Sequence, residues 1–84
     1  MNHHWMVKHD VQRALDGGRP VIAFESTVLT HGLPYPDSTR LALRVEEVAR
    51  EEGCVPATIG IIDGVVHVGM TPDDIDRLAA DKHA

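Results

Sequence analysis

Cysteine and aromatic residues are scarce in this 84-residue chain. Cys54 is the single cysteine, so no disulfide can form within the chain, and a reducing, cytoplasmic setting is expected. We expect a buried structural thiol, because the neighbouring residues 55–57 supply neither a base nor a cation that could activate it. Only Trp5, Phe24 and Tyr35 are aromatic, so a hydrophobic core must be built from Val, Ile, Leu and Ala.

Positive charge and long apolar runs are also lacking. The 8 Lys and Arg residues are outnumbered by 13 Asp and Glu residues, which gives a formal net charge of −5 and no basic cluster. This balance argues against binding to a nucleic-acid polymer or to an anionic membrane surface. No apolar run approaches the ~18–20 residues that a membrane span requires. We therefore expect a cytoplasmic chain that forms at most one small domain, residues 1–84.

The most informative stretch is an apolar run that leads directly into polar residues. Residues 21–28 predict a β-strand, and the uninterrupted apolar run 21–24 is typical of a strand covered on both faces. Glu25 follows this run and precedes the hydroxyl residues Ser26 and Thr27. Ligands of open α/β sheets bind beyond the carboxyl ends of the strands, so Glu25 is a candidate site residue that we expect to be partly desolvated.

Helices are predicted on both sides of this strand. Residues 5–16 carry apolar side chains at helical spacing, with Val11, Ala14 and Leu15 among them, and glycines at 17 and 18 end this first helix. Asp37 can cap a second helix over residues 38–52. Its apolar stripe is Leu41, Ala42, Val45, Val48 and Ala49, and the residues expected to face water are Arg40, Arg44, Glu47 and Arg50.

Residues 57–62 form the next apolar run, so strand, helix and strand predict a parallel βαβ unit with a right-handed crossover. Asp63-Gly64 then predicts a type I′ turn, because both central residues of that turn need positive φ, and residues 65–69 return antiparallel. The order Thr71-Pro72-Asp73-Asp74 predicts an N-capped helix that runs to the chain end.

The predicted fold class is α/β, with the element order α-β-α-β-β-α. Strands that are apolar on both faces need helices above and below them and further strands at their edges. The few strands predicted here cannot complete such a sheet. The chain is therefore expected to form an incomplete part of a three-layer α/β/α sandwich.

Two blocks of sequence resemble a known family. The first is Phe24-Glu25-Ser26-Thr27 followed by Thr30-His31-Gly32-Leu33-Pro34-Tyr35-Pro36, and the second is Pro56-Ala57-Thr58-Ile59-Gly60-Ile61-Ile62-Asp63-Gly64 followed by Val68-Gly69-Met70-Thr71. Together they are similar to the N-terminal signature of the pseudouridine-5′-phosphate glycosidases, or pseudouridylate synthases, which include indigoidine synthase A-like proteins. The resemblance extends from about Val11 to the chain end. Because family members are several times longer, it implies an N-terminal fragment.

The resemblance also implies an activity and its ligands. Family members reversibly cleave the carbon–carbon glycosidic bond of pseudouridine 5′-phosphate to uracil and ribose 5-phosphate. They use a lysine that forms an imine with the sugar. They also use manganese or another divalent metal, and they assemble as homotrimers. Glu25 matches the family's general acid/base. The lysine, metal ligands and phosphate ligands lie in segments without a counterpart here, so no metal ligand is assigned and the chain alone is expected to be inactive.

Alternatives stay open for each candidate residue. Without the resemblance, Glu25 is better interpreted as a strand-terminal carboxylate that accepts backbone N–H bonds. Ser26 and Thr27 can bind substrate oxygens or hold the loop through its own backbone. His31 can carry a proton or anchor its loop. A different class of function is a non-catalytic binding or assembly module that pairs an open sheet edge with other chains. Metal storage by the 6 dispersed histidines is a weaker alternative.

Overall fold

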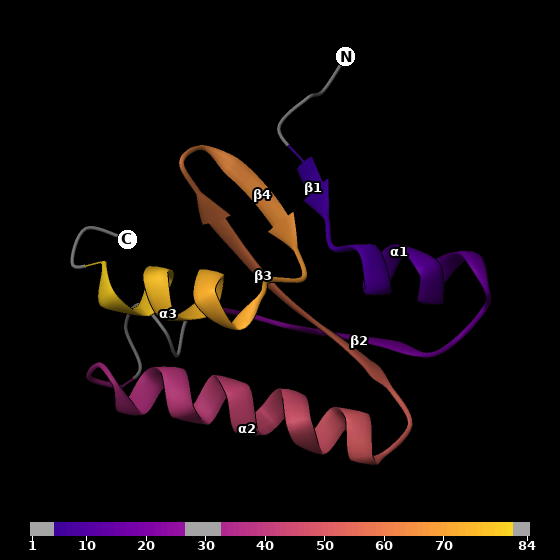
Figure 1. Ribbon diagram of the computed structural model, residues 1–84, viewed down its shortest axis with the longest axis horizontal. Coiled ribbons are helices and arrows are strands. Elements are labelled where there is room, and N and C mark those ends of the chain that lie inside the picture. The colour runs from indigo at the N-terminus through magenta and orange to yellow at the C-terminus, as the bar shows by residue number, and fades with distance from the viewer. Residues whose placement is uncertain (1–4, 27–32, 82–84) are drawn as a thin grey trace.

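The computed structural model describes residues 5–26 and 33–81, and it shows a mixed β-sheet with helices on both faces (Figure 1). The elements in chain order are β1 (Trp5–Val7), α1 (His9–Asp16), β2 (Val21–Phe24), α2 (Asp37–Glu51), β3 (Val55–Ile62), β4 (Val65–Val68) and α3 (Pro72–Ala80). The predicted α/β class is confirmed. Among the described helices, none has both the length and the apolarity needed to cross a membrane.

The strands lie in the order β1-β4-β3-β2. β2 runs parallel to the first half of β3, with Phe24 opposite Thr58, and α2 connects these two strands. β4 runs antiparallel to the second half of β3 and parallel to β1. The predicted parallel βαβ unit and the hairpin that follows it are therefore both confirmed.

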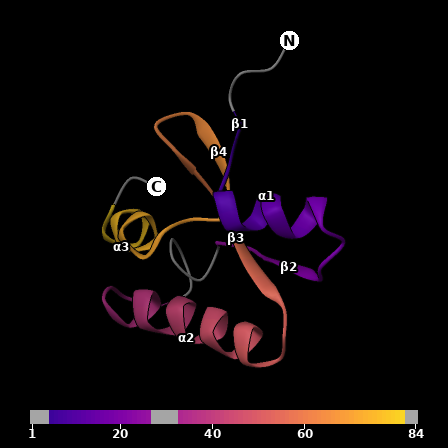
Figure 2. The ribbon, with the colours of Figure 1, turned by 45° about the vertical axis from the view of Figure 1, so that its right-hand side comes forward.

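Successive residues of β3 face opposite sides of the sheet, and this alternation separates two hydrophobic clusters. On one side, Val55 and Ala57 pack with Val11 and Ala14 of α1. On the other side, Ile62 belongs to a cluster with Ala42, Met70, Ile75 and Leu78. Figure 2 shows α1 and α3 on opposite sides of the strands. The sheet is thus the middle layer of the fold.

The first predicted helix is wrong over its first turn. Residues 5–7 form β1 instead, and α1 begins at His9. β1 is stabilised by parallel pairing with β4, which lies far along the chain, and local periodicity does not register such a partner. Val11 and Ala14 are buried as predicted, whereas Leu15 is 54% exposed.

The first predicted strand, residues 21–28, is correct in its start but not in its length or burial. β2 ends at Phe24, and residues 27–28 of the predicted strand lie outside the described part of the chain. Ile22 is 40% exposed and Ala23 is exposed too, because β2 is an edge strand. An uninterrupted apolar run therefore indicates a strand without showing whether it is central. β3 in turn begins at Val55, earlier than the predicted start at residue 57.

α2 begins one residue earlier than predicted. Pro36 occupies the N-cap position, and Asp37 lies in the first turn without acting as a side-chain cap. The carboxylate of Asp37 instead pairs with Arg40, at 3.5 Å. The proline that precedes the helix thus takes the position that the sequence analysis assigned to Asp37.

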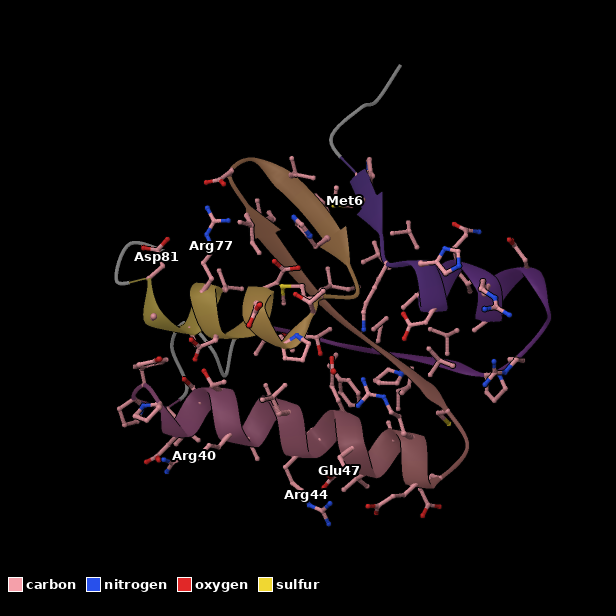
Figure 3. All side chains as sticks on the ribbon, in the orientation of Figure 1. Met6, Arg40, Arg44, Glu47, Arg77 and Asp81 are labelled. Atoms are coloured by element: carbon pink, nitrogen blue, oxygen red, sulfur yellow. The ribbon has the colours of Figure 1, made fainter. Side chains whose placement is uncertain are left out.

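The faces of α2 are largely as predicted. Ala42 and Ala49 are buried, whereas Leu41 and Val48, expected in the same stripe, are each 41% exposed. The charged residues predicted to face water, Arg40, Arg44, Glu47 and Arg50, are all exposed, and Arg44 pairs with Glu47. Figure 3 shows both of these side chains and Arg40 projecting outward from the helix. The predicted charged face is confirmed.

The two local signals after β3 are also confirmed. Asp63 and Gly64 both have positive φ, at 51° and 78°, as a type I′ turn requires. Thr71 caps α3 in a capping box with Asp74, in which each side chain accepts a hydrogen bond from the other residue's backbone N–H. α3 ends at Ala80 and so stops short of the predicted helix end.

Gly69 allows the start of α1 to lie against the end of β4. Its φ of +91° is a conformation that residues with side chains rarely adopt. A Cβ atom at this position would lie 2.8 Å from Cβ of Lys8 and 2.9 Å from Cγ2 of Val11. Beside it, the backbone N–H of Lys8 donates to the carbonyl oxygen of Val68 at 3.0 Å. A side chain at residue 69 would therefore separate α1 from the sheet.

We expect Gly69→Ala to lower the free energy of unfolding by about 2–5 kcal/mol, the sum of left-handed backbone strain and overpacking. Gly18→Ala is the matched control, because Gly18 also has positive φ, +70°, but has open space around the position of a Cβ. The control should lose only the strain contribution, about 1–2 kcal/mol. Urea denaturation measures both, and equal losses would contradict the close approach.

Candidate functional site

Glu25 lies directly beyond the carboxyl end of β2, where the sequence predicts it. It follows Phe24, which pairs with Thr58 of β3. Its side chain is exposed, so the expected partial burial is wrong for this chain. The reason is topological: β2 is a short edge strand, and its carboxyl end is open to solvent.

A pocket of about 240 Å³ lies between β2, β3 and α2, and Glu25 forms part of its wall. The lining residues are Phe24, Glu25, Leu41, Ala42, Val45 and Thr58. The wall is thus apolar except for one carboxylate and one hydroxyl group. Such a combination can orient a polar ligand while the apolar side chains exclude water. The carboxyl end of a parallel strand is also where α/β sheets bind their ligands.

A buried carboxylate is hydrogen-bonded to Thr58, which forms part of the wall of this pocket. Glu46 of α2 is only 2% exposed, and its Oε2 accepts a hydrogen bond from Oγ1 of Thr58 at 2.7 Å. Its Oε1 accepts a second hydrogen bond from Nη2 of Arg50 at 3.3 Å. Thr58 is 3% exposed, so this pair is removed from water. The contact fixes the orientation of the hydroxyl group in the pocket wall.

Glu46 is not among the residues predicted from the sequence, although the chain contains a signal for it. Glu46 lies four residues after Ala42 and three before Ala49, which places it on the face that α2 buries. A carboxylate at such a position needs a hydrogen-bond partner, because burying an unpaired charge is costly. Thr58, the only hydroxyl group in the apolar strand β3, is that partner.

The loop after the candidate site is attached to α3 through Asp76. Its carboxylate accepts hydrogen bonds from the Tyr35 hydroxyl group and from Oγ1 of Thr39, both at 3.3 Å. The hydrogen bond to Asp76, together with the negative charge of that carboxylate, raises the pKa of Tyr35. These contacts hold the start of α2 beside α3.

The other predicted site residues are described only in part. Ser26 is half-buried, directly after Glu25. Thr27 and His31 lie outside the described residues, so their substrate contacts stay predictions. Within residues 5–26 and 33–81, no group of three or more His, Cys, Asp or Glu side chains is placed to hold a metal ion. The manganese implied by the resemblance has therefore no assigned ligands.

Cys54 lies away from the Glu25 pocket and is half-buried, whereas we expected full burial. It lines a different pocket, of about 420 Å³, together with Arg13, Arg19 and Arg50. The sequence neighbours of Cys54 are apolar, but the fold brings arginines from α1, α2 and the loop before β2 close to it. This second pocket lies where β3 begins, at the opposite end of the β2-β3 pair from Glu25.

A protein-family model described as indigoidine synthase A like protein matches residues 10–84. The chain belongs to this family. The matched range includes every residue of the Glu25 pocket and the Glu46–Thr58 pair. The family resemblance predicted from the two sequence blocks is therefore confirmed.

Curated relatives in this family are pseudouridine-5′-phosphate glycosidases. The protein from Sorangium cellulosum is 51% identical over 76 residues, which cover 90% of this chain and 24% of the relative. The protein from Roseiflexus sp. is 55% identical over 73 residues, covering 87% of this chain and 24% of the relative. The chain thus spans about a quarter of the length of these relatives.

Two solved structures share the fold. The indigoidine synthase A (IdgA)-like protein of Thermotoga maritima superposes with a TM-score of 0.74 and 32% identity, over 94% of this chain and 26% of its own. The prealnumycin C-glycosynthase AlnA, solved in complex with ribulose 5-phosphate, gives a TM-score of 0.76 and 36% identity, over 98% of this chain and 26% of its own. Both likenesses support the incomplete α/β sheet predicted from the sequence.

We predict that Thr58→Val lowers the free energy of unfolding by about 1–3 kcal/mol, because Glu46 stays buried without its closest donor. In a Glu46→Leu background, the same change should cost little, since no carboxylate is left unsatisfied. A double-mutant cycle in urea should give a coupling energy of about 0.5–3 kcal/mol. Equal costs in both backgrounds would show that this hydrogen bond does not support the pocket.

Proposed function

We propose that this chain is the acid/base portion of a pseudouridine-5′-phosphate glycosidase. Such an enzyme reversibly cleaves the C-glycosidic bond of pseudouridine 5′-phosphate to uracil and ribose 5-phosphate. The observation that carries the proposal is the 51–55% identity to two such glycosidases over most of this chain. The family match covers residues 10–84, a range that includes the whole wall of the Glu25 pocket.

Glu25 is the proposed general acid/base. Cleavage of a carbon–carbon glycosidic bond leaves the base carbon in need of a proton, and synthesis in the reverse direction removes that proton again. A carboxyl group beside the bond can serve in both directions, and general acid/base catalysis of this kind contributes ~10²–10⁴-fold. Phe24, Leu41 and Val45 provide the apolar surroundings that exclude water once a ligand fills the pocket.

Thr58 is proposed to orient the ligand in this pocket. Its hydroxyl proton is donated to Glu46, so the oxygen can only accept a hydrogen bond from a ligand. It therefore favours a donor such as an N–H group of uracil or an O–H group of ribose. Ser26, Thr27 and His31, which the sequence analysis selected, are proposed as additional contacts to the same substrate.

No step is assigned here to a metal or to a lysine. Among the described residues, no group of three or more His, Cys, Asp or Glu side chains is placed to hold a divalent cation. Lys8 is the one lysine among residues 5–26 and 33–81, and its Nζ pairs with the carboxylate of Asp10 at 3.5 Å. It does not line the Glu25 pocket. Homotrimer formation also stays a proposal for the longer enzyme.

We expect the 84-residue chain alone to release no uracil from pseudouridine 5′-phosphate. The physical reason is that no amine nucleophile adjoins the Glu25 pocket among its lining residues. Chromatography of the reaction mixture measures uracil directly, in both the cleavage and the synthesis direction. Turnover by the purified chain would contradict this expectation and would place the whole reaction within it.

A chimera tests the role of Glu25. In it, residues 5–84 of this chain replace the segment of the Sorangium cellulosum glycosidase that contains the 76 matched residues. Glu25→Gln keeps the size of the side chain and removes its titratable proton. We expect kcat of the chimera to fall by ~10²–10⁴-fold while KM changes little, because the loss concerns proton transfer rather than binding.

Glu47→Gln is the matched control for this experiment. Its carboxylate lies on the outer face of α2, and its side chain is 61% exposed. The control should retain kcat and the urea midpoint of the chimera. If Glu25→Gln instead lowers the urea midpoint while kcat per folded molecule is unchanged, Glu25 is a structural carboxylate and not the acid/base.

Assembly through an open sheet edge is the second candidate function, and the surroundings of β2 favour it. A pocket of about 350 Å³ lies beside this edge strand, and its wall is formed largely by Ile22, Phe24, Val45, Val48 and Ala49. A strand from another chain could extend the sheet at β2. A chimera without turnover, together with a chain that binds its own copies, would favour assembly over the glycosidase.

A further inference from the structure

One face of the β1-β4-β3 part of the sheet is lined only by apolar side chains. Paired residues on neighbouring strands point to the same face, so the register defines two rows across it. The rows are Trp5–Val66–Ile61 and Val7–Val68–Ile59. Figure 1 shows β1, β4 and the second half of β3 side by side, whereas β2 pairs with the first half of β3. We call these six residues the apolar sheet face.

The apolar sheet face is largely uncovered. Ile61 is 63% exposed, Trp5 57% and Val7 37%, and the other members are half-buried. α1 lies over the neighbouring part of the same side, where Val11 and Ala14 pack on Val55 and Ala57, and it reaches Val68. On this side of the sheet, α1 therefore leaves the two rows of the apolar sheet face largely uncovered.

The opposite side of the same strands is covered, in contrast to the apolar sheet face. A Cβ atom on Gly60 would lie 2.9 Å from Leu78 of α3 and 3.1 Å from Met70, so α3 packs directly on this side of β3. Single exposed apolar residues are common on protein surfaces, but a contiguous apolar patch on a sheet marks an interaction surface. Strands in parallel pairs are normally covered on both faces by helices.

We propose that the apolar sheet face binds an apolar helix, placed alongside α1, from the polypeptide that corresponds to the remaining three-quarters of the longer family members. This chain matches 24–26% of the length of such relatives and superposes on two of them with TM-scores of 0.74 and 0.76. The relatives therefore combine this same segment with much additional chain. A helix beside α1 completes the layer that α1 begins.

A second copy of this chain is the competing occupant, and the size of the face argues against it. A stable dimer buries roughly 800 Å² on each partner. The exposed parts of six side chains, three of them half-buried, offer less than this. The additional polypeptide of the relatives is about three times longer than this chain, so its contacts can extend beyond the apolar sheet face to a larger total interface.

Trp5 provides a direct readout, because it is the only tryptophan of the chain and lies within the apolar sheet face. The probe is the part of the Sorangium cellulosum glycosidase outside the matched segment, with any tryptophan replaced by phenylalanine. Added to the 84-residue chain, it should form a 1:1 complex in analytical ultracentrifugation and shift the Trp5 emission to shorter wavelength. This readout does not depend on catalysis.

Ile61→Lys and Leu15→Lys form the matched pair of variants. Both residues are exposed in the chain, at 63% and 54%, but only Ile61 belongs to the apolar sheet face. A lysine at residue 61 should weaken the complex by at least ~10-fold, because the helix would then bury an unpaired ammonium group. Leu15→Lys should leave the affinity and the Trp5 shift unchanged. Circular dichroism checks that both variants are folded.

Three outcomes would overturn the proposal. A Trp5 shift that grows with the concentration of the chain alone, and that Ile61→Lys abolishes, would identify a second copy as the occupant. A complex that forms without any Trp5 shift would place the interface elsewhere. If no complex forms in solution, the chimera described under Proposed function decides, with every tryptophan other than Trp5 replaced by phenylalanine. Trp5 emission at the same long wavelength as in the chain alone would show that the apolar sheet face stays uncovered.

Discussion

The change of partner halfway along β3 is the feature on which the rest of this structure depends. Residues 55–58 pair with β2, and residues 59–62 pair with β4. Thr58 lies at the junction, where its carbonyl oxygen accepts a hydrogen bond from the backbone N–H of Gly69 at 3.1 Å and its hydroxyl group donates to Glu46 at 2.7 Å. A single residue thus ties both halves of the sheet to α2, and the Glu25 pocket lies against it.

The parts of the fold that the sequence predicts well are those decided by neighbouring residues. The turn at residues 63–64 and the capping box of α3 depend on φ preferences and hydrogen bonds that span at most three positions. β1 is different, because its residues fit a helical pattern locally and become a strand only through pairing with β4. The exposure of Ile22 is equally non-local, since it follows from the position of β2 at the edge of the sheet.

The candidate site divides in the same way. The position of Glu25 was predictable, because a carboxylate after an apolar strand must emerge at the carboxyl edge of the sheet. Its exposure was not, because that depends on what else covers this edge. Glu46 could have been predicted from its spacing to Ala42 and Ala49, but its partner Thr58 is set by how α2 crosses β3. Pairwise contacts between elements therefore limit what can be predicted from one sequence.

Within the proposed enzyme, the exposure of Glu25 and the exposure of the apolar sheet face have one physical consequence in common. A carboxylate in open water is well solvated as an anion, whereas a general acid benefits from less polar surroundings. The Glu25 pocket is open beside the edge strand β2, and the apolar sheet face is open beside α1. A polypeptide that covers both removes water from the carboxylate in the same event that completes the sheet. Under the proposed function, assembly of the fold and activation of Glu25 are then a single step.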